Sequence, residues 1–317
     1  MSRLFKALSD LNAEIVSPEV QASLRAAQSA ARPSIPKPSD KSEPFTLKVV
    51  LPMANSPATA RSEAVLETKI QDPPVAKPPQ PVEAPAVYVN VSPQSRLVAL
   101  TNPNGLGAEK FRALVTRFDH LRGKRELKSF QVTSSVINEG KTLLSANIGV
   151  TLAKYSGAKT LLVEGDLHRP SLTKLFGLDD MPGLGQWWCS GASDLGKFVY
   201  RLNGMPMWFL SAGQLFDQPS DLLRSAKFAN AFTQLAGQFE WTVVDSPPML
   251  PIVDVNLWSR LVDGTLLVVR EGVAPVKALK KGLQALDHPK LIGVVMNEAT
   301  ESGQTKYEGQ YYAGPKF

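Results

Sequence analysis

The sequence predicts an α/β protein with a doubly wound, mostly parallel sheet, and two observations predict it. From about residue 105 onward, short apolar runs typical of strands alternate with amphipathic stretches typical of helices. Three of the apolar runs end in polar or charged residues, at the edge where parallel sheets bind ligands. The predicted strands cover 128–134, 159–165, 207–211, 240–245, 264–270 and 291–296, and the predicted helices cover 108–122, 141–155, 220–238 and 275–287.

The first hundred residues have a different composition. Fourteen of the 25 prolines lie between residues 32 and 103, with few aromatic residues and no sustained period. Such a stretch buries too little apolar surface to offset its chain entropy. We therefore expect four parts: a short amphipathic helix at 1–16, a disordered Pro-rich linker at 17–104, a folded domain at 105–300 and a flexible tail at 301–317.

The helix expected at the N-terminus is amphipathic because Leu4, Leu8 and Leu11 share one face. This face could dock on a partner or lie on a membrane surface, or the short helix could have no fixed partner. The segment lacks the continuous apolar core of a signal peptide. No run of about 18 or more apolar residues occurs, so we expect no transmembrane segment.

The composition argues against several kinds of site. The single Cys189 excludes an internal disulfide and suits a reducing compartment. The three histidines are scattered along the sequence and predict no metal-binding cluster. The net charge of +6 permits contact with acidic surfaces, but no basic stripe with interleaved aromatic residues occurs, so we expect no nucleic-acid partner.

The first predicted strand leads into a Gly140-Lys141-Thr142 sequence that opens a helix. This is the context of a phosphate-binding loop, whose backbone N–H groups and helix dipole attract phosphate. Lys141 would reach the β- and γ-phosphates, and the Thr142 hydroxyl would bind Mg²⁺. The full pattern has Gly five residues before Gly140, where this chain has Ser135. The alternative is an ordinary helix start with an exposed lysine. The candidate nucleotide-binding residues here are Ser135, Asn138, Glu139, Gly140, Lys141, Thr142 and Leu143.

Carboxylates end two further predicted strands. Glu164 and Asp166 stand at alternate positions at the end of one strand, so they point the same way if the strand is regular. They could hold Mg²⁺ or accept a proton from an attacking hydroxyl. Asp245 ends another strand and fits a carboxylate near Mg²⁺. Each strand end alone could be a solvated turn, but the three in this order are hard to explain as coincidence.

Together the three segments resemble the Walker A, Walker A′ and Walker B motifs of the bacterial tyrosine kinases of capsule and exopolysaccharide synthesis. That family belongs to the deviant P-loop ATPases. The stretch from Leu261 to Arg270 resembles the strand after the Walker B loop, and Leu291 to Asn297 resembles the last strand. The resemblance covers about residues 105–317. It implies a P-loop NTPase fold, ATP and Mg²⁺ as cofactors, and a contact of Asn297 with adenine.

The resemblance also implies an activity, an ATP-dependent protein-tyrosine autokinase that regulates polysaccharide synthesis and export. Lys141, Asp166 and Asp245 would then be catalytic, and Thr142, Glu164 and Asp245 would hold the metal. The tail carries three of the six tyrosines in its last eleven residues, and these would be the autophosphorylation sites: Tyr307, Tyr311 and Tyr312. The implied partners are a membrane-bound activator of the chain-length-determinant type and further copies of the chain. The implied location is the cytoplasm, at the inner face of the membrane through that partner.

The chain departs from the family pattern at several positions. Glu164 replaces an aspartate, and its extra methylene shifts the carboxylate by about an ångström or more, enough to disturb metal geometry. Ile137 and Asn138 replace a Pro-Gly pair, although Asn tolerates the left-handed backbone that the loop needs. His168 replaces a common arginine, and Val136 stands where partition ATPases have lysine.

The oligomerisation helix of the family reads Glu-x-x-Arg-x-x-Arg, and here Glu109 and Arg112 match while Val115 does not. Together with Glu164, this mismatch favours a rival reading. In the rival reading the chain is a kinase-inactive, ATP-binding scaffold or regulator of polysaccharide export.

Overall fold

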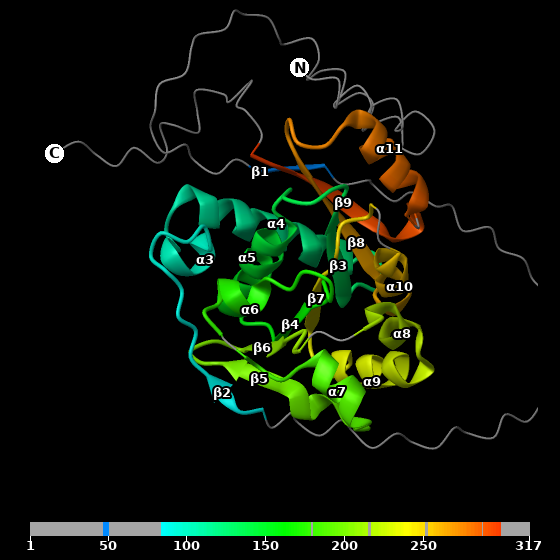
Figure 1. Cartoon of the computed structure of the whole chain (residues 1–317). Coiled ribbons are helices and arrows are strands. Elements are labelled where there is room, and N and C mark those ends of the chain that lie inside the picture. Colours follow the sequence, from blue (N-terminus) through cyan, green and yellow to red (C-terminus); the bar gives the residue numbers. More distant parts are fainter. Residues whose placement is uncertain are drawn as a thin grey trace, which may run out of the picture.

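The computed structural model describes residues 47–50, 84–178, 180–214, 217–250, 253–286 and 288–298. Within these residues the chain forms one nine-stranded sheet with the order β1-β9-β8-β3-β7-β4-β6-β5-β2. The β1–β9 and β5–β6 pairs are antiparallel and all other neighbours in the sheet are parallel. Helices cover both faces (Figure 1). The predicted α/β class with a doubly wound, mostly parallel sheet is therefore confirmed.

The strands are β1 (Leu47–Val50), β2 (Ala86–Val87), β3 (Ser129–Ser134), β4 (Thr160–Glu164), β5 (Val199–Leu202), β6 (Met207–Leu210), β7 (Trp241–Asp245), β8 (Gly264–Arg270) and β9 (Leu291–Asn297). The helices are α3 (Val98–Thr101), α4 (Leu106–Arg122), α5 (Lys141–Lys154), α6 (Leu172–Leu175), α7 (Leu184–Ser190), α8 (Pro219–Arg224), α9 (Ala226–Ala236), α10 (Asp254–Leu261) and α11 (Val276–Ala285), with short 3-10 turns at Leu195–Phe198 and His288–Lys290.

The central strands are buried on both faces, which explains their continuous apolar sequence. On β7, Val243 packs into the core under α4 and α5, whereas Val244 packs into the core under α9 and α10. Aromatic residues fill both layers: Phe118 and Phe130 lie 4.9 Å apart on one face, and on the other the rings of Phe232 and Trp258 lie 5.4 Å apart. The sheet is thus a rigid platform whose strand ends can position a site.

The six predicted strands all occur, with ends that differ by no more than one residue from the predicted ones. The helix predicted at 220–238 is instead two helices, α8 and α9. Ser225 interrupts it because its backbone is extended, with ψ of 135°, and its hydroxyl accepts from the N–H of Phe228 as an N-cap. The helix α10 was not predicted, since it is short and follows a proline-rich stretch.

The folded part begins earlier than the predicted boundary at residue 105. The short strand β2 pairs with β5, Leu97 is fully buried, and the N–H of Ala99 donates to Asn147 Oδ1 at 3.0 Å. This segment has no sequence period because it adds single apolar residues to a core that the rest of the chain supplies. The expected helix at 1–16, the linker residues 17–46 and 51–83 and the tail 301–317 lie outside the described residues.

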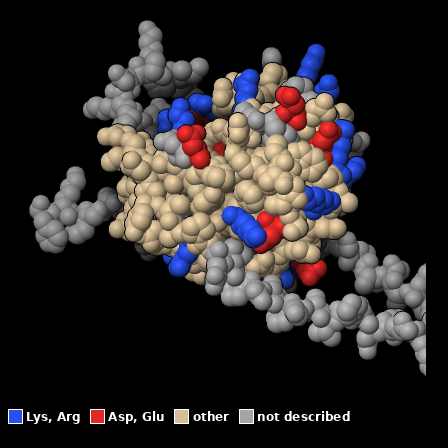
Figure 2. Space-filling view, turned by 60° about the horizontal axis from the view of Figure 1, so that its bottom comes forward, with Lys and Arg blue, Asp and Glu red and all other residues tan. Residues whose placement is uncertain are grey.

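The surface carries mixed charge. Figure 2 shows one face of the molecule, on which Lys and Arg side chains are scattered around a broad uncharged area and are interspersed with Asp and Glu. Across the part of the chain that the structure describes, none of the helices has the length and apolar character needed to cross a membrane.

Candidate nucleotide-binding site

The loop between β3 and α5 has the left-handed turns that a phosphate-binding loop needs. Asn138 has a φ of 64° and Gly140 a φ of 93°, so Asn138 adopts the conformation that we expected Asn to tolerate. A Cβ on Gly140 would lie 2.2 Å from Asn297 Nδ2. Gly140 is therefore required both by its backbone angle and by the close approach of β9.

Two of the predicted loop residues stabilise the loop with their side chains. Glu139 is fully buried, and its Oε2 accepts from the Ser135 hydroxyl at 3.0 Å and from the Val136 N–H at 2.8 Å. Its Oε1 accepts from the Arg270 N–H at 3.1 Å, which ties the loop to β8. Burial raises the pKa of Glu139, although these hydrogen bonds act in the opposite direction. The side chains of Ser135 and Glu139 thus maintain the shape of the loop, and a nucleotide would meet the loop mainly through its backbone.

Asn297, at the end of β9, lies against the loop. Its Nδ2 donates to the Glu139 carbonyl at 2.8 Å, and its Oδ1 is buried without a hydrogen-bond partner among the described residues. Leu143 lies half-buried in the first turn of α5, where its carbonyl accepts from Asn147. Asn297 therefore ties the loop to the end of β9.

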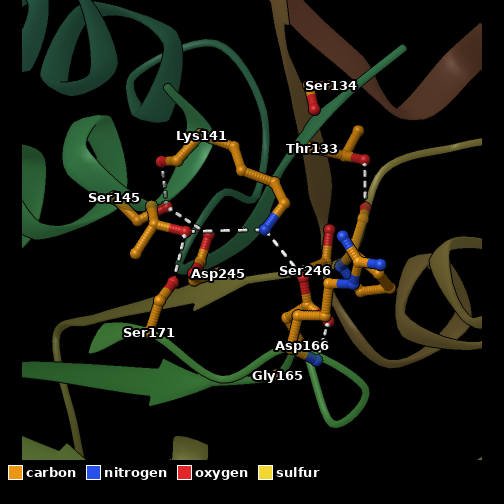
Figure 3. Close-up of polar contacts among 12 residues, drawn as sticks. Thr133, Ser134, Lys141, Ser145, Gly165, Asp166, Ser171, Asp245 and Ser246 are labelled. Carbon is orange, nitrogen blue, oxygen red and sulfur yellow. Dashed lines mark hydrogen bonds and ion pairs between the residues drawn. The ribbon is translucent and has the colours of Figure 1, made fainter. Parts of the chain in front are cut away.

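Lys141 is largely buried, unlike an exposed lysine at an ordinary helix start. Its Nζ lies 2.8 Å from Asp166 Oδ2 and 3.5 Å from Thr142 Oγ1. Figure 3 shows the lysine side chain extending toward Asp166, with Asp245 beside it. Burial by itself would lower the pKa of Lys141, but the charges of Asp245 and Asp166 outweigh it and raise the pKa. The lysine is therefore a fixed positive charge between two carboxylates.

Asp245 is the carboxylate whose hydrogen bonding is incomplete. It is fully buried at the end of β7, and its Oδ1 accepts from the Ser145 hydroxyl at 3.2 Å. Its Oδ2 is buried with no hydrogen-bond partner in the described chain. Burial raises the pKa of Asp245 to about 6, partly offset by the charge of Lys141. A bare buried carboxylate oxygen near the Thr142 hydroxyl is a donor set that suits Mg²⁺, which prefers oxygen ligands. These residues fit the metal that the resemblance implies.

Glu164 differs from Asp245 because both of its oxygens have hydrogen-bond donors. Oε1 accepts from the Thr173 N–H at 3.0 Å, and Oε2 accepts from the Thr173 hydroxyl at 2.5 Å and from the Ala212 N–H at 3.1 Å. The Ser211 hydroxyl lies 3.4 Å from Oε2. The carboxylate joins β4 to α6 and to the residues after β6.

The loop that carries Asp166 is attached to its neighbours by backbone and side-chain contacts. The Arg169 N–H donates to Asp166 Oδ1 at 3.0 Å, and the Gly165 N–H donates to the Asp245 carbonyl at 2.8 Å. The Trp258 indole N–H donates to the Gly165 carbonyl at 3.0 Å. The helix α10 therefore helps to position Asp166.

A second contact between this loop and α10 was not predicted. His168 Nε2 lies 2.8 Å from Asp254 Oδ2, and the Ser220 hydroxyl donates to Asp254 Oδ1 at 2.5 Å. Asp254 is almost fully buried. The replacement of the family's arginine by His168 could be seen in the sequence. Its partner Asp254 could not be predicted, because it lies 86 positions away in α10, a helix that was not predicted.

Two hydroxyl residues of the site were also missed. Ser145 binds Asp245, and the Ser171 hydroxyl donates to Thr142 Oγ1 at 3.2 Å. Ser145 stands three residues after Thr142 on α5, so helical spacing could have indicated it. The structure thus brings together Lys141, Thr142, Asp166 and Asp245, with Glu164 behind them. The predicted autophosphorylation sites lie outside the described residues: Tyr307, Tyr311 and Tyr312.

Comparison with known proteins identifies the family, although the chain matches no protein-family profile. Over 223 residues the chain is 32% identical to CapB of Staphylococcus aureus, which is named as a putative tyrosine-protein kinase, and the match covers 69% of this chain and 96% of CapB. The chain belongs to the bacterial tyrosine-protein kinase family. It is also 28% identical to the tyrosine-protein kinase YwqD of Bacillus subtilis over 226 residues, which are 71% of this chain and 94% of YwqD.

A solved structure agrees with this family assignment. The crystal structure of the chimerical protein CapA2B2 superimposes with a TM-score of 0.58 and 25% identity, covering 66% of this chain and 91% of that chain. About two thirds of this tyrosine-protein kinase family member therefore shares its fold with that structure.

Proposed function

We propose that this chain is an ATP-dependent protein-tyrosine autokinase that regulates capsular or exopolysaccharide synthesis and export. The observation that carries the proposal is the arrangement around Lys141. Its ammonium lies between Asp166 and Asp245, and Asp245 keeps one buried oxygen without a partner beside the Thr142 hydroxyl. A bound Mg²⁺ would supply positive charge beside these carboxylates, and Lys141 would then be free to pair with the phosphates.

The loop residues Ser135 to Leu143 would bind ATP, chiefly through backbone N–H groups and the α5 dipole. Lys141 would hold the β- and γ-phosphates, and Asn297 would lie near the base. Thr142 and a carboxylate, Asp245 or Glu164, would hold Mg²⁺, and the bare oxygen of Asp245 favours Asp245. The metal, when bound, neutralises negative charge on the phosphate oxygens.

Asp166 would act on the attacking tyrosine. In the transfer, the phenolic oxygen forms a bond to the γ-phosphorus while the bond between that phosphorus and the β-bridging oxygen breaks, and ADP leaves with the electron pair. Asp166 would accept the phenolic proton. Because Lys141 occupies Asp166 Oδ2 in this structure, Nζ must move toward the phosphates to release the carboxylate.

The proposed phosphate acceptors are Tyr307, Tyr311 and Tyr312, presented by a neighbouring copy of the chain. We further propose a membrane-bound activator of the chain-length-determinant type, which would bring the chain to the inner face of the membrane. The relatives support such a setting, since ExoP of Rhizobium meliloti, 30% identical over 219 residues, is named as a succinoglycan biosynthesis transport protein.

The second candidate is a kinase-inactive, ATP-binding scaffold of polysaccharide export. The specific observation in its favour is Glu164, whose carboxylate is committed to Thr173 and Ala212 where the family has a shorter acid near the metal.

One experiment separates the two functions. The purified full-length chain is incubated with Mg²⁺-ATP, with and without the cytoplasmic part of a candidate activator, and its C-terminal peptide is analysed by mass spectrometry. Phosphate on the tail tyrosines is expected for the kinase. Binding of ATP without any phosphotyrosine in the presence of activator would favour the scaffold.

A further inference from the structure

Glu164 has a role that its position in the Walker A′ segment does not suggest. We propose that Glu164 is a positioning residue: it holds α6 so that Ser171 orients the Thr142 hydroxyl toward the metal, and it is not itself a metal ligand. This inference rests on the proposed Mg²⁺-ATP binding and specifies how this chain accommodates a glutamate at that place.

The hydrogen bonds of Glu164 support the positioning role. Its carboxylate is fully buried and receives donors on both oxygens, two from Thr173 and one from Ala212. A carboxylate offers about four acceptor positions, and these three donors leave one position open, on Oε1, so a metal would have to compete with donors that are already well placed. Asp245, by contrast, has a buried oxygen without a partner.

A short chain of contacts leads from Glu164 to the proposed metal ligand. Thr173 stands in the first turn of α6, and Ser171 immediately precedes that helix. The Ser171 hydroxyl donates to Thr142 Oγ1 at 3.2 Å, which fixes one direction around the Thr142 oxygen. In Figure 3, Ser171 lies at the lower left, below Ser145, and Lys141 lies above both. Displacement of α6 would therefore change the orientation of the Thr142 hydroxyl.

The length of the side chain explains why glutamate suits this place. An aspartate would withdraw the carboxylate by roughly one C–C bond, about 1.5 Å. Hydrogen bonds of 3.0 and 3.1 Å would then become too long to count as bonds. Contrary to a simple expectation from the family pattern, restoring aspartate should therefore weaken the site.

The negative charge of Glu164 still affects the pKa values of Lys141 and Asp245. It contributes, as a smaller cause than Asp245 and Asp166, to the raised pKa of Lys141. It also adds to the raised pKa of Asp245, for which burial is the largest cause. A purely electrostatic role and a positioning role must therefore be separated by variants that leave this charge unchanged.

Thr173 provides that separation because its substitution keeps Glu164 intact. Thr173→Val removes one hydroxyl at nearly constant shape, Thr173→Ser restores a hydroxyl, and Lys174→Ala changes an exposed neighbour on the same helix. Calorimetry on the full-length variants measures ATP affinity with and without Mg²⁺, and thermal unfolding reports whether each variant is folded. Residues that orient metal ligands typically contribute about 10- to 100-fold to metal affinity, and a residue one step further away should act at the lower end of this range. We expect Thr173→Val and Glu164→Asp to reduce the Mg²⁺-dependent gain in ATP affinity by about 10-fold, Thr173→Ser to restore it, and Lys174→Ala to match the wild type.

The outcomes are distinct. An unchanged or larger Mg²⁺ effect in Thr173→Val would overturn the positioning role, since a released Glu164 would then have been free to bind the metal. A gain of Mg²⁺ affinity in Glu164→Asp would overturn it as well. Failure of the wild-type chain to bind Mg²⁺-ATP would instead overturn the proposed function, and this inference with it.

Discussion

The ends of β4 and β7 carry two acids that the sheet places side by side and that the protein treats in opposite ways. Glu164 and Asp245 are paired in register on adjacent parallel strands, and both are fully buried. Glu164 is surrounded by donors, whereas Asp245 has one oxygen without any in the described chain. Position at a strand end therefore does not by itself assign a role to an acid. The supply of hydrogen-bond donors separates an acid that stabilises structure from one that is ready for a cation.

The largest effect on tail phosphorylation is expected at a third acid, Asp166. Unlike Glu164 and Asp245, Asp166 forms an ion pair with Lys141. Asp166→Asn should reduce tail phosphorylation by about 10²- to 10⁴-fold, the usual contribution of a general base. ATP affinity should change far less, because the substitution keeps the shape of the side chain. Phosphopeptide mass spectrometry over time measures the rate, with calorimetry as the control. Phosphorylation at the wild-type rate would remove Asp166 from the mechanism.

Lys141 should show the next largest effect, on nucleotide affinity. Lys141→Met removes a charged donor to phosphate, which costs roughly 3 kcal/mol or about 100-fold in affinity. Lys141→Arg keeps the charge and is the matched control, although its longer planar group should restore affinity only in part. Isothermal calorimetry with Mg²⁺-ATP makes the measurement. Unchanged affinity in the methionine variant would contradict the phosphate-loop interpretation.

Removing the negative charge of Asp245 should raise the free energy of unfolding at pH 7, whereas removing that of Glu164 should lower it. The pKa of Asp245 is raised by burial from 3.8 to about 6, so the folded state keeps the proton to higher pH than the unfolded state does. The stability from protonated Asp245 is therefore full below about pH 4 and is lost as the pH rises to about 6. Asp245→Asn should stabilise the nucleotide-free protein at pH 7 by up to roughly 3 kcal/mol, with little gain near pH 4.

Glu164→Gln is the contrasting variant for this prediction. It replaces one acceptor oxygen by an amide group that faces donors, so it should destabilise the protein at pH 7. Denaturant unfolding at pH 4, 5, 6 and 7 gives both curves. If both variants changed stability in the same direction, the distinction between the two acids would be wrong.

The smallest effect is expected where α10 contacts the loop of Asp166. His168→Ala removes one of the two side-chain partners of the buried Asp254, at a cost of about 1 kcal/mol in the free energy of unfolding. Arg169→Ala, an exposed neighbour, should stay within about 0.5 kcal/mol of the wild type. Chemical denaturation compares the two. An equal loss in both variants would show that the His168–Asp254 contact contributes nothing specific.

The sequence predicted the parts of the site that depend on local pattern. Apolar strands with polar ends placed Lys141, Asp166 and Asp245 correctly at one edge of the sheet, because the ends of parallel strands must meet there. It could not predict the partners of Glu164. Thr173 and Ala212 stand in a helix of four residues and in an irregular segment, where no periodicity exists to be read. The contact of His168 with α10 escaped for the same reason, since it joins residues 86 positions apart.

The ion pair between Lys141 and Asp166 couples nucleotide binding to the proposed base. In this structure one oxygen of the proposed base is occupied by the lysine side chain that would hold ATP. A tyrosine that arrived first would find no free acceptor at that oxygen. A bound tyrosine would therefore keep its proton at that oxygen until ATP draws Lys141 away, so nucleotide binding itself would activate the base, whichever substrate binds first.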